Sequence, residues 1–304
     1  MKKFLAILLC VAMTATLIVG CSSSSDSDSD TSSNSGSESS SDFDTSSEIS
    51  VVSREDGSGT RGAFVELTGV EEKDADGNKV DNTTEEAIIA NSTSVVMTTV
   101  AGDEYAIGYV SLGSVNETIK VLTVEGVEAT EDNINNGTYT LSRPFNIITN
   151  GDVDEVTQDF IDYIMSEEGQ AVISENGYIE VENSGSFAGG DVSGSIVVAG
   201  SSSVTPVMEK LKEAYEAINE NVTIEVQESD STTGINSTAD GTCQIGMASR
   251  ELSDDELALG LEPTVIAMDG IAVIVNTENP MDDISIDAIK DIFCGNITTW
   301  DEVQ

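Results

Sequence analysis

The residues best suited to bind a ligand lie between Ser53 and Arg61, in the segment Ser-Arg-Glu-Asp-Gly-Ser-Gly-Thr-Arg. An alternating apolar stretch precedes this segment and a helical pattern follows it, which predicts a strand-to-helix turn. Unpaired N–H groups and the helix dipole make a helix N-terminus attractive to an anion. Arg54 and Arg61 flank the turn in a chain with only 12 Lys and Arg residues. The segment therefore favours an anion site slightly over an ordinary turn, which Gly-Ser-Gly also fits.

Two further segments combine hydroxyls, glycine and a helix start. Gly200-Ser-Ser-Ser-Val-Thr-Pro206 follows the apolar stretch 196–199, and proline suits the first turn of a helix. Ser229-Asp-Ser-Thr-Thr-Gly234 follows the alternating stretch 222–226. Each turn alone fits an ordinary capped helix, but together they could surround one tetrahedral oxyanion. Charge-assisted hydrogen bonds contribute about 1.5–3 kcal/mol each, so a handful suffices for micromolar binding.

The composition argues against catalysis. The chain has no histidine, which excludes Ser-His-Asp triads and metal sites that need imidazole. The three turns lack the lysine of a nucleotide P-loop, and a Gly-x-Ser-x-Gly elbow would have no histidine partner. The sequence therefore predicts a binding protein without catalytic residues, cofactor or metal.

Two other groups could suggest a metal site. Asp74-Ala-Asp-Gly-Asn78 resembles a calcium loop but lacks the closing glutamate, so a surface turn is expected. Cys10 lies in an apolar leader and Cys21 follows it, which leaves Cys243 and Cys294. Two thiols make no Cys-only zinc site, and their pairing cannot be read from sequence. We favour two separate buried thiols.

The charge balance limits the partners. The net charge is -44, from 12 basic and 56 acidic residues, and nucleic-acid binding needs a basic surface. This balance suits a soluble, self-repelling protein outside the cell. A small anion would have to be captured by local donors against an adverse overall field.

The N-terminus has the features of a secretory signal, predicted over residues 1–20. Lys2-Lys3 precede an apolar run that ends at Val19, and Ile-Val-Gly-Cys21 resembles a bacterial lipobox. The run is short for a spanning helix. Cys21 would then carry a lipid that anchors the chain at the outer face of the cytoplasmic membrane of a Gram-positive bacterium. The Ser/Asp-rich stretch 21–47 is predicted to be a disordered tether.

Strands and helices alternate over the remaining chain. Strands are expected at 105–110, 145–148, 196–199, 222–226, 245–250 and 265–275. Helices are expected at 93–101, after the capping boxes that begin at Thr83 and Ser253, over 156–177, after Pro206, and at 286–293 behind Ser285. This alternation predicts an α/β fold with largely parallel sheets, whose ligands bind at the carboxyl ends of strands.

Four segments together resemble the phosphate-binding lipoprotein of bacterial high-affinity phosphate ABC transporters. They are Ser53-Arg-Glu-Asp-Gly-Ser-Gly-Thr60, Gly200-Ser-Ser-Ser-Val-Thr-Pro206, Ile245-Gly-Met-Ala-Ser-Arg250 and Ile292-Phe-Cys-Gly-Asn-Ile-Thr-Thr-Trp300. The resemblance extends from Ile49 to Gln304. It implies a two-lobed periplasmic-binding-protein fold (type II) that closes over inorganic phosphate, as a monomer that delivers phosphate to a membrane permease and its ATPase.

The order of the segments differs from that family. The segment from the Gly-Ser-Ser-Ser loop to the tryptophan comes first there and second here, which indicates a circular permutation. The expected lobes are 48–138 plus 273–304 and 139–182 plus 194–272, and the flexible linker 183–193 would join the family's usual termini. Glu48 and Gln304 should then lie close together. Alternatively, the chain is a fragment of a longer tandem protein.

The resemblance also implies roles for individual residues. Arg54 would make a forked contact to phosphate, with Asp56 pairing to orient it. The hydroxyl and N–H donors would be Ser58, Gly59, Thr60, Ser202, Ser203 and Ser231. Some family members have an aspartate where this chain has Ser249, and a carboxylate would accept the proton that phosphate retains and sulfate lacks. Asp269 is the proposed acceptor here, and Arg250 is either a second cation or a salt-bridge partner.

Three rival functions remain open. The chain could bind another tetrahedral oxyanion such as sulfate, molybdate or tungstate. It could be a surface lipoprotein, an adhesin or scaffold, that reuses the fold without a ligand. A phosphate-ester hydrolase ranks last, because the chain has no histidine and no evident metal cluster.

Overall fold

The computed structural model describes residues 43–303. The predicted signal, the lipidation site Cys21 and most of the tether lie outside the described residues. No helix within residues 43–303 has the length and apolar character needed to cross a membrane.

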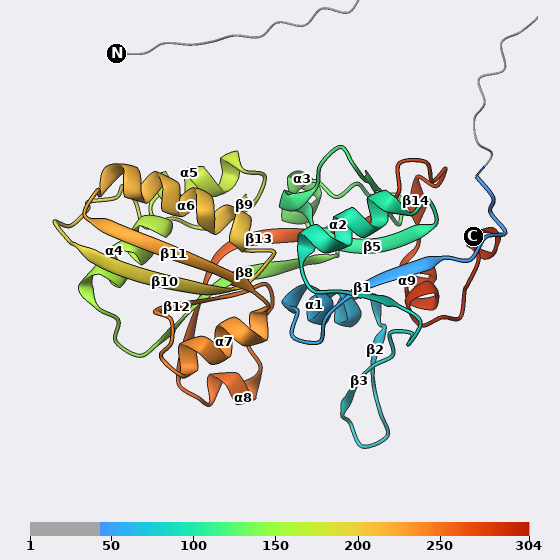
Figure 1. Ribbon diagram of the computed structural model, residues 1–304, viewed down its shortest axis with the longest axis horizontal. Helices are drawn as coiled ribbons and strands as arrows, with labels where there is room; N and C mark the ends of the chain where they lie inside the picture. The colour runs from blue at the N-terminus through green and yellow to red at the C-terminus, as the bar shows by residue number, and fades with distance from the viewer. Residues whose placement is uncertain (1–42, 304) are drawn as a thin grey trace, which may run out of the picture. The chain divides into compact units, whose positions relative to one another are not determined.

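A mixed sheet forms the centre of the described chain (Figure 1). Its strands are β1 (Ser50–Arg54), β4 (Ile88–Ala90), β5 (Ala106–Ser111), β6 (Lys120–Val121), β8 (Ser142–Asn150), β9 (Ile179–Glu180), β10 (Gly194–Ser201), β11 (Val222–Ser229), β12 (Ile245–Ala248) and β13 (Leu261–Val275). The order along the sheet is β11-β10-β12-β8-β13-β5-β1-β4, with β6 and β9 paired to β13.

The helices are α1 (Gly59–Thr68), α2 (Thr93–Gly102), α3 (Glu131–Asn135), α4 (Glu155–Ile164), α5 (Glu167–Glu175), α6 (Thr205–Ile218), α7 (Ser231–Ala239), α8 (Asp254–Leu257) and α9 (Ile286–Phe293). Side-chain caps begin most of them, as expected for serine and aspartate. The Ser92 hydroxyl accepts the N–H of Val95, and the Asp230 carboxylate accepts that of Thr233. The expected caps at Ser253 and Ser285 are confirmed.

The sheet is parallel at both ends and antiparallel in the middle. β1 pairs in parallel with β4 and β5, and β10 pairs in parallel with β11 and β12. β8 and β13 run antiparallel to each other and connect the two parallel groups. The turns after β1, β10 and β11 lead into α1, α6 and α7, so all three predicted strand-to-helix turns are confirmed.

The two largest groups of buried apolar residues lie toward opposite ends of the sheet, with smaller ones beside them. On the β10 side, Phe160 and Tyr215 pack with the buried faces of β10 to β12. On the β5 side, Phe64, Tyr109 and Phe293 pack together. We use "β10 side" and "β5 side" for these two groups.

Along β13, the buried residues pack on the β10 side up to Ala267 and on the β5 side from Ile271. Tyr139 and Leu141, expected in the lobe that contains β10, instead pack on the β5 side.

One predicted long helix is in fact two. The pattern over 156–177 forms α4 and α5, separated by Met165 and Ser166. Ser166 caps α5 by accepting the N–H of Gly169, and its own hydroxyl donates to the carbonyl of Tyr163. A Cβ on Gly169 would collide with the carbonyls of Tyr163 and Ile164, so this close approach of backbones needs glycine.

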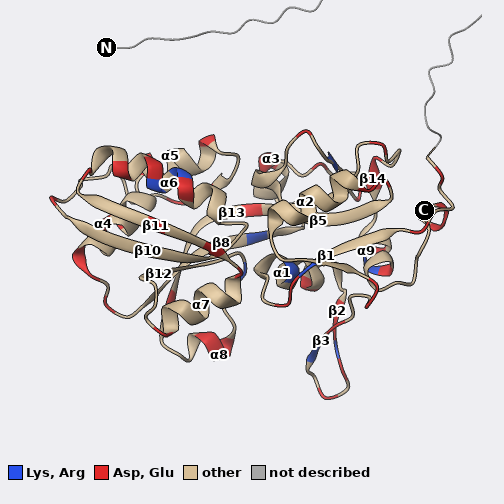
Figure 2. Ribbon diagram, viewed as in Figure 1, with Lys and Arg blue, Asp and Glu red and all other residues tan. Residues whose placement is uncertain are grey.

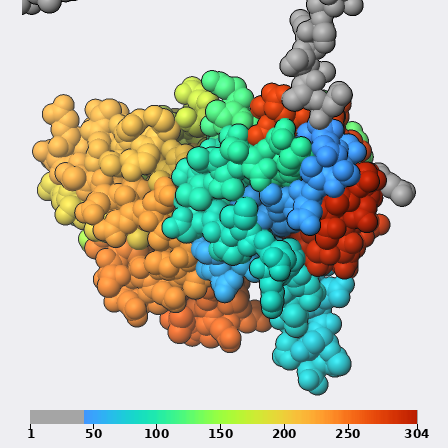
Figure 3. All heavy atoms as spheres, turned by 45° about the vertical axis from the view of Figure 1, so that its right-hand side comes forward, coloured from blue at the N-terminus to red at the C-terminus, as the bar shows by residue number. Residues whose placement is uncertain are grey.

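The segment after Thr83 was also predicted wrongly. The apolar residues 87–89 do not form a capped helix, because Ile88–Ala90 is the edge strand β4. Before it, β2 (Glu71–Lys73) and β3 (Lys79–Asp81) form a hairpin whose tip contains Asp74–Asn78, as the surface-turn prediction required. This hairpin projects from the surface in Figure 3. The remaining short strands, β7 (Thr123–Val124) and β14 (Asp283–Ile284), pair with each other.

The beginning and end of the described chain meet on the β5 side. Glu48 forms a β-bridge with Thr299, and the N–H of Asp301 donates to the carbonyl of Thr45 at 2.7 Å. Phe43 packs against Tyr105 and Trp300, so the folded part begins before residue 48, the start that the sequence predicted.

The segment 183–193 contacts the β10 side at a few residues. Phe187 lies against Tyr163 and Tyr215, and the N–H of Ser184 donates to the carbonyl of Met165. The other residues of 183–191 are exposed, and the flexible joint stays a prediction.

Candidate anion-binding site

The predicted donors converge where the β10 side meets the β5 side. Thr60 Oγ1 lies 2.8 Å from Ser203 Oγ, and Arg54 Nη2 donates to Ser202 Oγ at 3.1 Å. All four side chains are buried. Two turns almost 150 residues apart in the sequence thus come into contact. We call Thr60, Ser202, Ser203, Ser231 and Ser249, together with the residues that contact them, the hydroxyl cluster.

The start of α1 contributes backbone as well as side chains. Ser58 is the N-cap and accepts the N–H of Arg61. Gly59 follows, and a Cβ there would lie 2.8 Å from Ser249 Oγ and closer still to Ser231 Oγ. Only glycine lets this helix N-terminus approach the serines of the β10 side so closely.

The serines of the β10 side are held by one another. Ser201 Oγ donates to Ser249 Oγ at 3.0 Å, and the N–H of Ser249 donates to Ser231 Oγ at 3.1 Å. Ser203 takes part through its N–H, which donates to Ser201 Oγ. These hydroxyls come from the turns after β10, β11 and β12, which end at the same edge of the sheet.

Thr93 is a donor that the sequence reasoning missed. It is the first residue of α2, its hydroxyl lies 3.3 Å from Ser202 Oγ and 3.2 Å from Ser203 Oγ, and its N–H donates to Ser202. The signal was the run Asn91-Ser-Thr-Ser94 at the end of a strand. It went unnoticed because residues 87–89 were assigned to a helix instead of to β4.

Arg54 is oriented by Glu55 and not by Asp56. Arg54 is only 2% exposed, and its Nε and Nη2 donate to the two carboxylate oxygens of Glu55 at 2.8 and 2.7 Å. The Asp56 side chain is 98% exposed and pairs with Arg61. The predicted Arg54–Asp56 pair is therefore wrong, because Asp56 lies on the outer face of the turn.

Asp269 lies in a second buried cluster. Its carboxylate accepts from Ser111 Oγ at 2.9 Å, from the N–H of Gly113 at 3.5 Å, and from Arg143 Nη2 at 3.1 Å. Burial raises the pKa of Asp269 to about 6, although the Arg143 guanidinium opposes this rise. Its hydrogen bonds thus go to the cluster around Arg143 rather than to the hydroxyls.

Arg250 is a salt-bridge partner in this structure. Both of its terminal nitrogens donate to Glu256 at 2.8 Å, and Nη2 also contacts Thr232 Oγ1. Cys243 and Cys294 are free thiols, as expected, with Cys243 buried and Cys294 only half-buried. Residues 43–303 contain no group of acidic, Cys or His side chains that could hold a metal ion.

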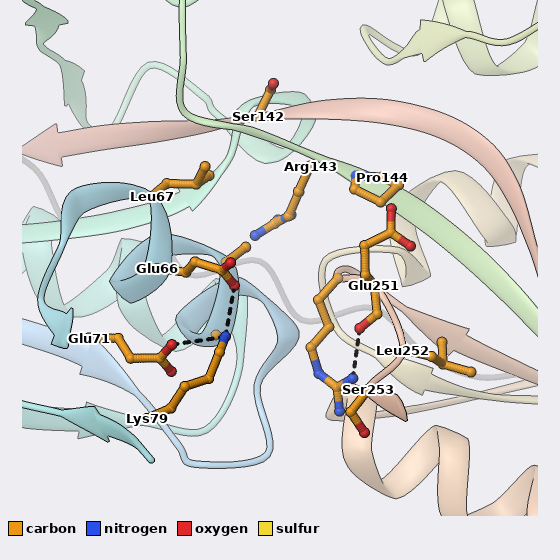
Figure 4. Close-up of a pocket in the computed structure, with 13 residues that line it drawn as sticks. Glu66, Leu67, Glu71, Lys79, Ser142, Arg143, Pro144, Glu251, Leu252 and Ser253 are labelled. Atoms are coloured by element: carbon orange, nitrogen blue, oxygen red, sulfur yellow. Dashed lines mark hydrogen bonds and ion pairs between the residues drawn. The ribbon is translucent and has the colours of Figure 1, made fainter. Parts of the chain in front are cut away.

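A groove of about 470 Å³ lies between α1, β8 and the segment 250–253 (Figure 4). Arg143 and Pro144 of β8 form one wall, and Leu252 and Ser253 form another. Lys79 lies on the α1 wall, where it pairs with Glu66 and Glu71.

Comparison with known proteins identifies the family. A model described as a PBP superfamily domain matches residues 35–168 and 185–304. Phosphate-binding protein PstS 2 of Streptococcus agalactiae serotype V is 54% identical over 257 residues, which cover 84% of this chain and 88% of that protein. The chain belongs to the PstS family of phosphate-binding proteins.

Other PstS proteins agree with this assignment. PstS 2 of Streptococcus pneumoniae serotype 4 is 44% identical over 260 residues, covering 85% of this chain and 89% of the relative. The crystal structure of a phosphate-binding protein of a phosphate ABC transporter from S. pneumoniae TIGR4 superposes with a TM-score of 0.67 at 44% identity, covering 84% of this chain and all of that one.

Membership of the PstS family confirms two predictions. The α/β periplasmic-binding-protein fold is the fold of this family, and the resemblance inferred from the four motifs is correct. PstS proteins are transport receptors and not enzymes.

Proposed function

We propose that this protein binds inorganic phosphate between the β10 side and the β5 side and delivers it to an ABC permease. The observation that carries the proposal is the contact of buried Arg54 with Ser202 across the two sides. Hydroxyls of five segments surround that contact, and the PstS relatives are named for phosphate binding.

The hydroxyl cluster has the donors that a tetrahedral oxyanion needs. Thr60, Thr93 and Ser231 lie in the first turns of α1, α2 and α7, where backbone N–H groups have no carbonyl partner within the helix and the dipole is positive. In the structure the hydroxyls bond to one another. Each can rotate toward an anion, donating its hydrogen to phosphate oxygens, and its own oxygen can accept the proton that phosphate carries.

The negative net charge of the protein explains why an anion must be bound by donors close to it. Acidic segments are spread over α4, α5, α6 and α8, and basic ones are few (Figure 2). The net charge of -44 opposes an approaching anion, so affinity depends on short contacts that bulk salt screens little. Arg54 provides the formal positive charge in the hydroxyl cluster.

The proposal includes the setting of the protein. Cys21 would carry a lipid anchor at the outer face of the cytoplasmic membrane of a Gram-positive bacterium, and the body would act as a monomer. The support is the lipobox Ile-Val-Gly-Cys21 and the Ser/Asp-rich stretch that follows it.

The proposal also includes two lobes in circularly permuted order. The β-bridge between Glu48 and Thr299 supports it, because in the family's order the segments that contain these two residues would follow each other directly. PstS of Bacillus subtilis matches over only 113 residues, 36% of this chain and 38% of that protein. A collinear comparison of two chains with different segment order would give such partial coverage.

Titration calorimetry of the purified protein with phosphate, sulfate, molybdate and tungstate tests the function. We expect phosphate to bind with micromolar affinity or better, and Arg54→Ala to lose at least about a hundredfold. Lys210→Ala, on the exposed face of α6, is the matched control and should bind as the parent does. Tighter binding of sulfate would assign another oxyanion, and unchanged affinity in Arg54→Ala would remove Arg54 from the site.

A thermal shift separates the receptor from a scaffold without a ligand. A micromolar binder at a hundredfold excess of phosphate gains about 2.7 kcal/mol in the free energy of unfolding. A scaffold that reuses the fold would show no shift with any of the four anions.

A further inference from the structure

Arg143 is a buried guanidinium with two donors that lack a partner. It lies on β8 directly opposite Asp269 of β13 and is 2% exposed. Nη2 donates to Asp269, whereas Nε and Nη1 make no hydrogen bond. Most buried N–H groups in proteins are paired, so two unpaired ones on a single buried cation require an explanation.

Arg143 lines a groove together with Gly62 and Ala63 of α1, the helix that begins at the hydroxyl cluster. Figure 4 shows the side chain extending from β8 toward α1, the helix whose first turn contains Gly59 and Thr60. Burial lowers the pKa of Arg143 to about 10 against the opposing effect of Asp269, and the charge of Arg54 is near enough to lower it as well. The guanidinium carbon also lies 5.4 Å from the centre of the Phe145 ring, a cation–π distance, but the ring offers no oxygen or nitrogen acceptor for Nε or Nη1.

The position of Arg143 suits a contact that forms with the ligand. β8 and β13 are the strands that run from the β10 side to the β5 side, and Arg143 pairs with Asp269 in the stretch where β13 changes from one side to the other. Its partner Asp269 is fixed by Ser111 and Gly113 of the β5 side. Asp269 thus holds the guanidinium in place and leaves Nε and Nη1 for another acceptor.

We infer that Arg143 is a second phosphate-binding guanidinium, which donates from Nε or Nη1 to an oxygen of the anion, and that Asp269 is its positioning residue. The inference rests on the proposed function and concerns the same site. It gives Asp269 a role different from that of direct proton acceptor.

Calorimetry with phosphate on single variants tests the inference. Arg143→Gln removes the charge and keeps a polar side chain, and we expect the affinity to fall about ten- to hundredfold, the value of one charge-assisted hydrogen bond. Lys79→Gln is the matched control, since Lys79 lines the same groove but is paired with Glu66 and Glu71. It should change the affinity less than about twofold.

The role of Asp269 requires a double-mutant cycle. If Asp269 acts through Arg143, Asp269→Asn weakens phosphate and sulfate binding alike, and adding it to Arg143→Gln causes little further loss. If Asp269→Asn instead removes only the preference for phosphate over sulfate, Asp269 is the direct acceptor and the positioning role is wrong.

A spectroscopic measurement distinguishes a ligand contact from a structural role. In ¹⁵N-labelled protein, the Nε–Hε resonance that disappears in Arg143→Lys should shift when phosphate is added. A resonance that does not move, together with unchanged affinity in a folded Arg143→Gln, overturns the inference.

The two proposals fail in different ways. A parent protein that binds no phosphate ends the proposed function itself. A parent that binds phosphate, with loss in Arg54→Ala but not in Arg143→Gln, ends only the inference about Arg143.

Discussion

Arg54 and Glu55 are chain neighbours and form the ion pair nearest to the hydroxyl cluster. Glu55→Ala leaves a buried guanidinium without its carboxylate, so we expect the free energy of unfolding without ligand to fall by about 1–3 kcal/mol, less than for a fully buried pair because Glu55 is 23% exposed. Asp56→Ala, one residue along, should change it by less than about 0.5 kcal/mol. Urea denaturation of both variants measures this, and equal losses would contradict the assignment of Glu55 as the partner.

Asp269 gives stability a defined pH dependence. Its pKa in the folded protein is raised to about 6, above the value of about 3.9 in an unfolded chain. The folded state therefore binds more protons than the unfolded state in this range, and the contribution of Asp269 is lost as pH rises through 6. We expect the stability of the parent relative to Asp269→Asn to fall by about 1–3 kcal/mol between pH 4 and pH 7. A rise over this range would mean that attraction to Arg143 outweighs burial.

The site residues that could be predicted from the sequence are those that lie in short local motifs. Ser58 and Thr60 lie in a turn that the nine consecutive residues Ser53–Arg61 already identify as an anion-site candidate. The serines after β10 lie in a second short motif of the same kind. Sequence does not show which of two adjacent carboxylates faces inward, so Asp56 was chosen where Glu55 pairs with Arg54. Arg143 lies inside a strand, where no capping or glycine pattern marks it.

At the scale of elements, the first turn of α1 contains a matched pair of glycines. Gly59→Ala would place a methyl group against Ser231 and Ser249, so we expect phosphate affinity to drop at least about tenfold. The nearest atom to a Cβ on Gly62 is Arg250 Cδ at 3.6 Å, an ordinary contact. Gly62→Ala should keep the affinity and raise the free energy of unfolding by up to about 1 kcal/mol. Calorimetry and urea denaturation report the two effects, and similar affinities for both variants would contradict the close approach at Gly59.

Most strands and helices followed from periodicity and caps, and the exceptions have tertiary causes. The spacing of Val156, Phe160 and Ile164 continues at Ala171, yet Ser166 caps a new helix because the backbone at Gly169 packs against the end of α4. The capping box at Thr83 was equally plausible as a helix start. The segment instead forms β4, because it pairs with β1, and no local sequence pattern predicts that pairing.

At the scale of the whole molecule, the chain order can be changed without removing a residue. A reordered chain would begin at Asn183, run to Val303, continue through a short Gly/Ser linker to Phe43 and end at Glu182. Because residues 45 and 301 are already hydrogen-bonded, we expect this chain to fold and to bind phosphate within about threefold of the parent. Calorimetry on both chains is the measurement. A reordered chain that folds poorly would show that the covalent connection through residues 183–193 is needed.

The meeting of the chain ends also provides an optical signal. Trp300 is the single tryptophan of the sequence, its Nε1 donates to the carbonyl of Tyr105, and Phe43 lies edge-on to its ring. Its fluorescence therefore reports, without any label, whether Phe43 is packed against Trp300. Tension applied through the N-terminal stretch would register in this emission while the ligand cluster stays intact.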